Sequence, residues 1–253
     1  MPKRFKRIVL VFIVLISFSF SGCFLFGEAV DRSTEDMGNR MAASMMMPMY
    51  KTYAMSLMAA YFWAGGFWLA HHPYEPGEWT RWSHEIERAG GDEDERQPVQ
   101  VEKAFLRRNA DGSEWWRLKA IGEDAENTFV FEALFSPDRT RLVRLLARMG
   151  DKETTEVSFE EGENTFPATN AFEDGWINDH MVGTVNVGTG NVSFSANHVQ
   201  FSAADGSGQA NFYFSSDVPG GLVKYLFENR EGDRYTIALT AHGSGASSEL
   251  GAY

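Results

Sequence analysis

Residues 129–149 read FVFEALFSPDRTRLVRLLARM, a stretch that alternates apolar and other residues on both sides of one turn. The residues expected on one face of the first strand are Phe129, Phe131, Ala133 and Phe135. Those expected on the same face of the second strand are Val143, Leu145, Ala147 and Met149, opposite Arg141, Arg144 and Arg148. Ser136-Pro137-Asp138 supplies the turn. Period-two alternation around a turn predicts two antiparallel strands that share one buried face.

The same alternation extends outward from this hairpin in both directions. The inward positions of the neighbouring strands are Val99, Val101, Phe105, Trp116, Leu118, Ala120, Thr155, Val157 and Phe159. A second series of strands is expected at residues 184–187, 192–201, 209–215, 222–227 and 235–240. No helical period separates the strands, which excludes parallel-sheet folds. The sequence therefore predicts roughly ten antiparallel strands after Glu78, with a loop at residues 164–179 and a loose tail at residues 244–253.

A helical period precedes the strands. A capping-box-like start at Ser33 is followed by methionines that share one helix face, namely Met37, Met41 and Met45. Pro48 is expected to kink this helix or to open a second one, and Gly65-Gly66 ends the pattern. The predicted fold class is α+β, with helix at residues 33–64 packed on a large antiparallel sheet.

Charge is almost absent from this helical segment. Lys51 carries the only formal charge between Arg40 and Glu75, so the helix must be largely covered. Three readings follow: a buried core helix, a lid or lining for a hydrophobic ligand, or a segment that touches a membrane. Methionine side chains adapt to varied apolar partners. The candidates for lining a ligand cavity between helix and sheet are Met45, Leu57, Met58, Phe131 and Phe135.

A helical segment followed by such a meander resembles the LolA-like lipoprotein carriers. Residues 212–224, FYFSSDVPGGLVK, also look like the late strand–loop–strand of related lipoproteins. The resemblance implies an unclosed β-barrel whose concave face is covered by helices and binds acyl chains or other apolar ligands. The soluble carriers are not themselves lipidated, so this chain would act at a membrane rather than shuttle between two.

The N-terminus has the layout of a secretory signal, a basic cluster and then the uncharged residues 8–20. Ser21-Gly22-Cys23 follows and resembles the lipobox of bacterial lipoproteins, although Phe20 stands where that family most often has Leu. The resemblance implies a signal peptide at residues 1–22, lipidation of Cys23 and a tether at residues 23–32. The remaining residues, 33–253, form a single domain. Phe24 implies sorting to the outer membrane, and an uncleaved membrane anchor over residues 8–27 is the alternative.

Composition narrows the classes of function. The chain of 253 residues has a net charge of −12, and removal of a leader with four basic residues and no acids takes it to −16. Such a surface repels phosphate backbones, so we expect no nucleic-acid partner. The single cysteine leaves no thiol for a disulfide or for catalysis. The fold must be held by its core alone.

No catalytic motif is present, and we expect neither an enzyme nor a cofactor. The sequence lacks a G-x-S-x-G elbow, a P-loop and an H-E-x-x-H pair. The best metal candidates are His71, His72, His84 and Glu85, but adjacent histidines on an extended segment point to opposite sides. Ordinary polar roles for these residues are therefore favoured.

Two further features concern surfaces. Pro219, Gly220 and Gly221 form either a tight connection between strands or a ligand-approach loop at a cavity mouth. Trp115 and Trp116 must point to opposite faces of their strand, so one of them is expected to leave an aromatic surface exposed for interaction. The expected function is an envelope-anchored lipoprotein that binds an apolar ligand or lipid chain. The alternative is a non-catalytic subunit that docks an envelope protein partner, its cavity filled by its own helix.

Overall fold

A computed structural model describes residues 39–58, 61–62, 73–89, 99–122, 124–165, 174–189, 192–202 and 206–253. The chain forms two compact units, Met1–Gly65 and Gly66–Tyr253. The signal peptide, Cys23, the tether, His71 and His72 lie outside the described residues, so the predictions on them stay predictions. Among the helices that are described, none is both long enough and apolar enough to cross a bilayer.

The described part of the first unit is the helix α2, at Asn39–Met58, together with residues 61–62. It continues through Pro48, so Pro48 does not open a second helix there, while the alternative expectation of a kink stays a prediction. Residues 33–38, 59–60 and 63–64 of the predicted helix lie outside the described residues. Met45 and the adjacent pair Leu57 and Met58 all belong to α2.

The second unit is built on one sheet, whose strands alternate with turns as the sequence pattern predicts. The strands are β1 Trp79–Glu87, β2 Val99–Arg108, β3 Glu114–Ile121, β4 Phe129–Phe135, β5 Leu142–Met149, β6 Thr155–Glu156, β7 Met181–Thr189, β8 Val192–Ser202, β9 Gly208–Phe214, β10 Leu222–Asn229 and β11 Arg234–Gly243. Two short helices, η2 at Ala125–Asn127 and α3 at Asp174–His180, complete it. The predicted loop at residues 164–179 is therefore partly helical.

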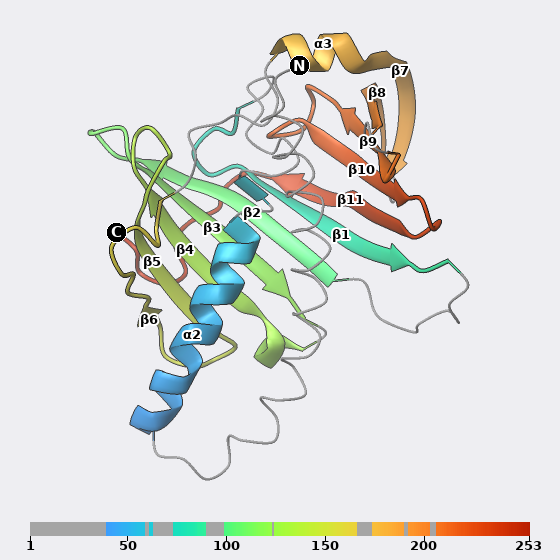
Figure 1. The fold of residues 1–253 in the computed structure, drawn as a ribbon. Coiled ribbons are helices and arrows are strands. Elements are labelled where there is room, and N and C mark those ends of the chain that lie inside the picture. The colour runs from blue at the N-terminus through green and yellow to red at the C-terminus, as the bar shows by residue number, and fades with distance from the viewer. Residues whose placement is uncertain are drawn as a thin grey trace. The chain divides into compact units, whose positions relative to one another are not determined.

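All strand pairs in the described sheet are antiparallel, which confirms that prediction. The order is β6-β5-β4-β3-β2-β1-β11-β10-β9-β8-β7, so two meanders are joined where β1 pairs with β11 (Figure 1). The described sheet of eleven strands is open, because its two margins, β6 and β7, do not pair with each other. Packing of a helix on this sheet remains a proposal.

A change of register in β5 corrects one predicted position. The pairing of β4 with β5 shifts between Leu134 and Phe135. Leu142 therefore takes the buried place, and Val143, predicted to face inward, is 46% exposed. The following residues keep the predicted alternation, since Leu145 and Ala147 are fully buried.

Candidate functional site

Strands β1–β5 present one face that is rich in buried aromatic residues, called here the aromatic face. Its large members are Trp82, Phe105, Trp116, Phe131 and Phe135, each at most 3% exposed. Phe105 is paired across the strands with Trp116, and their rings stack with centroids 4.6 Å apart. The predicted candidates Phe131 and Phe135 both belong to this face because they lie four residues apart on β4.

The other three cavity candidates belong to the first unit. Leu57 and Met58 are buried, 4% and 0% exposed, and Met45 lies in the same helix. The five candidates thus fall in two units, two on the aromatic face and three on α2. That they meet in one cavity stays a prediction.

A lysine lies buried within the aromatic face. The side chain of Lys103 is fully buried, with its Nζ 4.9 Å from the ring centroid of Trp116 and 5.1 Å from that of Tyr74. Burial, together with the positive charge of Arg139, lowers the pKa of Lys103 well below its ordinary value. The aromatic rings stabilise the cationic form through their negative faces.

The carboxylate of Glu114 pairs with two arginines at the end of the aromatic face. Glu114 is 3% exposed and accepts hydrogen bonds from Arg108, Arg139 and the Trp116 indole. Burial alone would raise the pKa of Glu114, but the hydrogen bond and charge of Arg139, with the bonds from Trp116 and Arg108, lower it. The sequence gives no signal for this cluster, because Glu114 stands in an ordinary turn-strand junction.

The loop with Pro219, Gly220 and Gly221 is a tight connection between β9 and β10. The Gly221 amide donates to the Val218 carbonyl at 2.8 Å, and both glycines have positive φ, 73° and 80°. Pro219, Gly220 and Gly221 are buried, and Gly220 packs so closely on Tyr74 that a Cβ there would overlap the ring. The Tyr74 hydroxyl is hydrogen-bonded to Thr80 on β1. The loop is thus fixed to the aromatic face, and a role in ligand approach stays a prediction.

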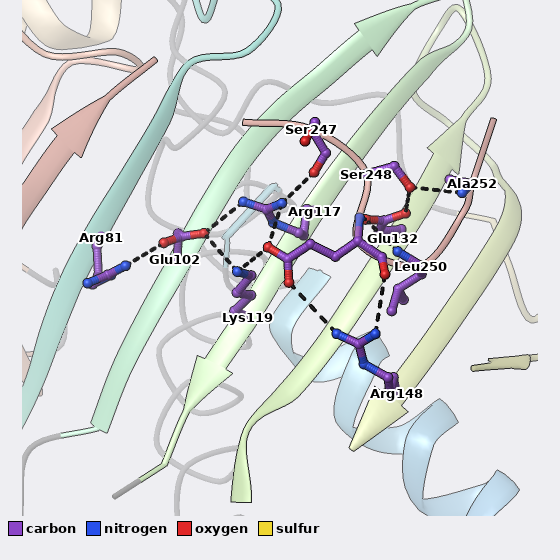
Figure 2. Close-up of polar contacts among 11 residues, drawn as sticks. Arg81, Glu102, Arg117, Lys119, Glu132, Arg148, Ser247, Ser248, Leu250 and Ala252 are labelled. Carbon is purple, nitrogen blue, oxygen red and sulfur yellow. Dashed lines mark hydrogen bonds and ion pairs between the residues drawn. The ribbon is translucent and has the colours of Figure 1, made fainter. Parts of the chain in front are cut away.

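The C-terminal residues 244–253, called here the strap, cover the opposite face of β2–β5. Ser248 Oγ and the amides of Glu249 and Leu250 donate to the buried Glu132 carboxylate at 2.6, 2.6 and 3.3 Å. Figure 2 shows Glu132 together with the strap residues that bind it. The prediction of a loose tail was therefore wrong.

Ion pairs extend this attachment across four strands. Glu249 pairs with Arg117 at 2.8 Å, with Lys119, and with Arg148 at 3.9 Å. Arg117 also binds Glu102 at 3.0 Å, and Glu102 in turn pairs with Arg81 (Figure 2). Burial alone would raise the pKa of Glu102, but the hydrogen bond from Arg81 and the charges of Lys119 and Arg117 lower it.

The strap also buries the tryptophan that was expected to be exposed. Trp115 and Trp116 do point to opposite faces, yet each is only 3% exposed. Trp115 packs in one cluster with Leu250 and Ala252, and its ring lies 6.3 Å from that of Tyr253. The expected exposed aromatic surface at Trp115 is therefore absent.

His84 of β1 is buried and hydrogen-bonded to a tyrosine. Its Nδ1 shares a hydrogen bond of 2.5 Å with the Tyr235 hydroxyl, whereas Glu85, next to it on the strand, is exposed. In the described parts of the chain, no group of three or more His, Cys, Asp or Glu side chains is placed to hold a metal ion.

We expect the stability of the protein to fall between pH 6.5 and pH 4.5 because of His84. Burial lowers the pKa of His84 from 6.5 to about 3, so folding favours the neutral ring. Its contribution is complete above pH 6.5 and is lost as the pH falls towards 3. Over two pH units the loss is about 2–3 kcal/mol. The lowered pKa values of Glu102 and Glu114 act in the same direction only below about pH 4.5.

Urea unfolding at pH 7 and pH 5 measures this effect. The variant His84→Phe keeps a ring at the site and should flatten the curve between these two values. An equal fall of stability in the variant would contradict the assignment to His84.

Comparisons with known proteins give likenesses of fold only. No protein-family model and no curated protein matches the sequence. Among solved structures, MucB in complex with MucA(peri) is 16% identical with a TM-score of 0.36, over 71% of this chain and 54% of that chain. This chain thus spans about half the length of the MucB chain.

Two further structures match at similar levels. A protein with a YmcC-like fold from Bacteroides fragilis is 12% identical with a TM-score of 0.35, over 68% of this chain and 98% of that one. A DUF1329 family protein from Desulfovibrio piger is 11% identical with a TM-score of 0.28, over 70% and 87% of the two chains. At these sequence identities and TM-scores, the similarity does not indicate what this chain binds.

Proposed function

We propose that this protein is a lipid-anchored protein of the bacterial envelope that binds an apolar ligand or lipid chain without catalysis. The observation that carries the proposal is the aromatic face, on which Phe105, Phe131 and Phe135 gather apolar rings across β2–β4. A surface of this kind binds by removing hydrocarbon from water and needs no catalytic group. The open margins of the sheet fit the unclosed barrel that the sequence resemblance implies.

The position of the protein is part of the proposal. Acylation of Cys23 would hold the folded units at a membrane, and the basic, apolar and small residues before it support export. Phe24 supports the outer membrane as the destination. The excess of acidic residues disfavours adhesion to anionic lipid head groups.

Metabolic labelling with a fatty-acid probe tests the anchor. We expect wild-type protein to take up the label and the variant Cys23→Ala to take up none and to leave the membrane fraction or remain unprocessed. Incorporation of the label into both proteins would show that acylation occurs elsewhere. Wild type without any label would reject the lipobox.

A second candidate function is a non-catalytic interaction subunit whose apolar interior is already filled. The specific observation in its favour is that Leu57, Met58, Phe131 and Phe135 are all closed to solvent, none more than 4% exposed. In that case the aromatic face is a core, and the partner binds elsewhere.

Single aspartate substitutions separate the two functions. Met45→Asp, Leu57→Asp and Met58→Asp place a charge on α2, and each protein is assayed for binding of the apolar dye N-phenyl-1-naphthylamine and for thermal melting. If the helix lines a ligand cavity, we expect dye binding to fall at least about tenfold while the melting temperature changes little. If it is core, an unpaired buried charge unfolds the domain. The exposed substitution Val143→Asp is the matched control.

The contradicting result for ligand binding is clear. Collapse of melting in all three variants, with no dye bound by wild type at any concentration, would reject the ligand-binding function. The interaction subunit would then remain.

A further inference from the structure

The two margins of the sheet differ in how they are protected from pairing. The β6 margin is only two residues long, Thr155–Glu156, and carries the ion pair of Glu156 with Arg144 at 2.7 Å. Short length and charge are the usual means of blocking an edge strand. The β7 margin is nine residues long, Met181–Thr189, and in the described sheet it pairs with β8 alone (Figure 1).

The β7 margin also lacks charge and exposes apolar side chains. Residues 181–204 contain no Asp, Glu, Lys or Arg. Val182 is 61% exposed, Val185 is 40% exposed, and Val192 at the start of β8 is 54% exposed. Valine and threonine have high β-propensity, and the strand contains no proline. An edge of this kind is a template for a further strand.

We propose that β7 pairs with β7 of a second copy of this chain, edge to edge and antiparallel, so that two sheets join into one. The distribution of charge favours a second copy of the chain as the partner of β7. With a net charge of −12, two copies repel each other over most of their surface, whereas the hairpin of β7 and β8 has no charge to repel. The same lack of charge gives no means of selecting a basic or acidic partner strand.

The strand is also suited to pairing with itself. The pairing of β7 with β8 shifts register between Met181 and Gly183, so the regular part of β7 begins at Gly183. A two-fold axis at Val185 sets this residue against its own copy and Thr184 against Asn186, both within that regular part. Antiparallel pairing over this length adds main-chain hydrogen bonds in symmetry-related pairs. Asp179 precedes the strand by two residues and so falls beyond the paired length.

Cysteine cross-linking in the full-length protein, in cell envelopes, tests the pairing. Opposed residues in an antiparallel pair have Cα atoms roughly 4.5–5.5 Å apart, which a disulfide can span. Mild oxidation should therefore cross-link Val185→Cys into a dimer, and Thr184→Cys with Asn186→Cys when the two are mixed. Wild type, whose one cysteine is Cys23, controls for that thiol. Val143→Cys, on the exposed side of β5, is the matched control and should stay monomeric.

Sedimentation of the detergent-solubilised full chain gives the second measurement. We expect wild type and Val143→Lys to form dimers. For Val185→Lys we expect the dimer dissociation constant to rise about tenfold or more, because two lysines then oppose each other at the axis. Equal thermal melting of the variants excludes loss of folding as the cause. A monomer at every concentration, or a dimer that no cysteine of β7 cross-links and Val185→Lys does not weaken, would overturn the proposal. Pairing of β7 with a different protein in the envelope would overturn it as well.

Discussion

Glu132→Ala is expected to lower the free energy of unfolding by about 3 kcal/mol, because three donors of the strap lose their acceptor together. Glu132 is fully buried on β4, and it accepts from Ser248 Oγ, the Glu249 amide and the Leu250 amide. Each donor left unsatisfied in a buried position costs about 1–3 kcal/mol, less where water can enter. Urea unfolding measures the difference.

A chain that ends at Gly243 completes a double-mutant cycle. Removal of residues 244–253 takes away Leu250 and Ala252, which pack on Trp115, and should cost at least about 4 kcal/mol. In the shortened chain Glu132→Ala should be nearly neutral, because the donors that it served are gone. Glu156→Ala, in an exposed ion pair with Arg144, is the control and should cost less than about 0.5 kcal/mol. An equal cost of Glu132→Ala in both chains would show that the carboxylate acts independently of the strap.

Much of the sheet could be predicted because its signal is local. Alternating apolar positions, such as Phe129, Phe131, Ala133 and Phe135, indicate which residues share a face of the sheet. Turn residues indicate where the chain reverses between strands. Antiparallel pairing follows from the short connections. The error at Val143 came from a register shift between β4 and β5, which leaves the alternating pattern of residue types unchanged. The strand predicted over Thr155, Val157 and Phe159 is shorter than expected, since β6 ends at Glu156.

The strap could not be predicted, because its contacts are distant in sequence. Its residues are small and polar without a period, which is also the composition of loose tails. What orders them is Glu132, more than one hundred residues earlier, whose position within an apolar strand reads as an ordinary outward acid. The burial of Trp115 depends on the same strap, because Leu250 and Ala252 pack on it. A buried acid or base among apolar neighbours, Lys103 included, is recognised only when the structure shows what surrounds it.

The candidate site was predicted in part for the same reason. Phe131 and Phe135 share one face because strand periodicity demands it. The pairing of Glu114 with Arg139, 25 residues away, and the contact of Gly220 with Tyr74 required the fold, since they join segments that are distant in sequence. Arg108 is close to Glu114 in sequence and faces it across the β2–β3 hairpin. The Pro-Gly-Gly sequence indicated a turn but not the ring against which it packs.

Gly220→Ala is expected to cost about 3 kcal/mol of unfolding free energy, against about 1 kcal/mol for Gly221→Ala. Both glycines have positive φ, so alanine at either position is destabilised by the strain of a left-handed backbone conformation. They differ in space: a Cβ at Gly221 meets its first neighbour, the Ser215 carbonyl oxygen, at 3.8 Å, while one at Gly220 overlaps the Tyr74 ring. That ring cannot move freely, because its hydroxyl bonds Thr80 and its edge packs on Trp116 at 5.2 Å between centroids.

Removal of the ring tests this explanation. In a Tyr74→Ala background the cost of Gly220→Ala should fall to that of Gly221→Ala, because only the backbone strain remains. Thermal melting and urea unfolding of the four variant proteins, namely Gly220→Ala, Gly221→Ala, Tyr74→Ala and Tyr74→Ala with Gly220→Ala, give the coupling between positions 74 and 220 by comparison with wild type. If Gly220→Ala costs the same with and without the ring, the loop is held by its backbone hydrogen bonds alone. A coupling of about 2 kcal/mol would instead show that the loop is fixed to the aromatic face through the Tyr74 ring.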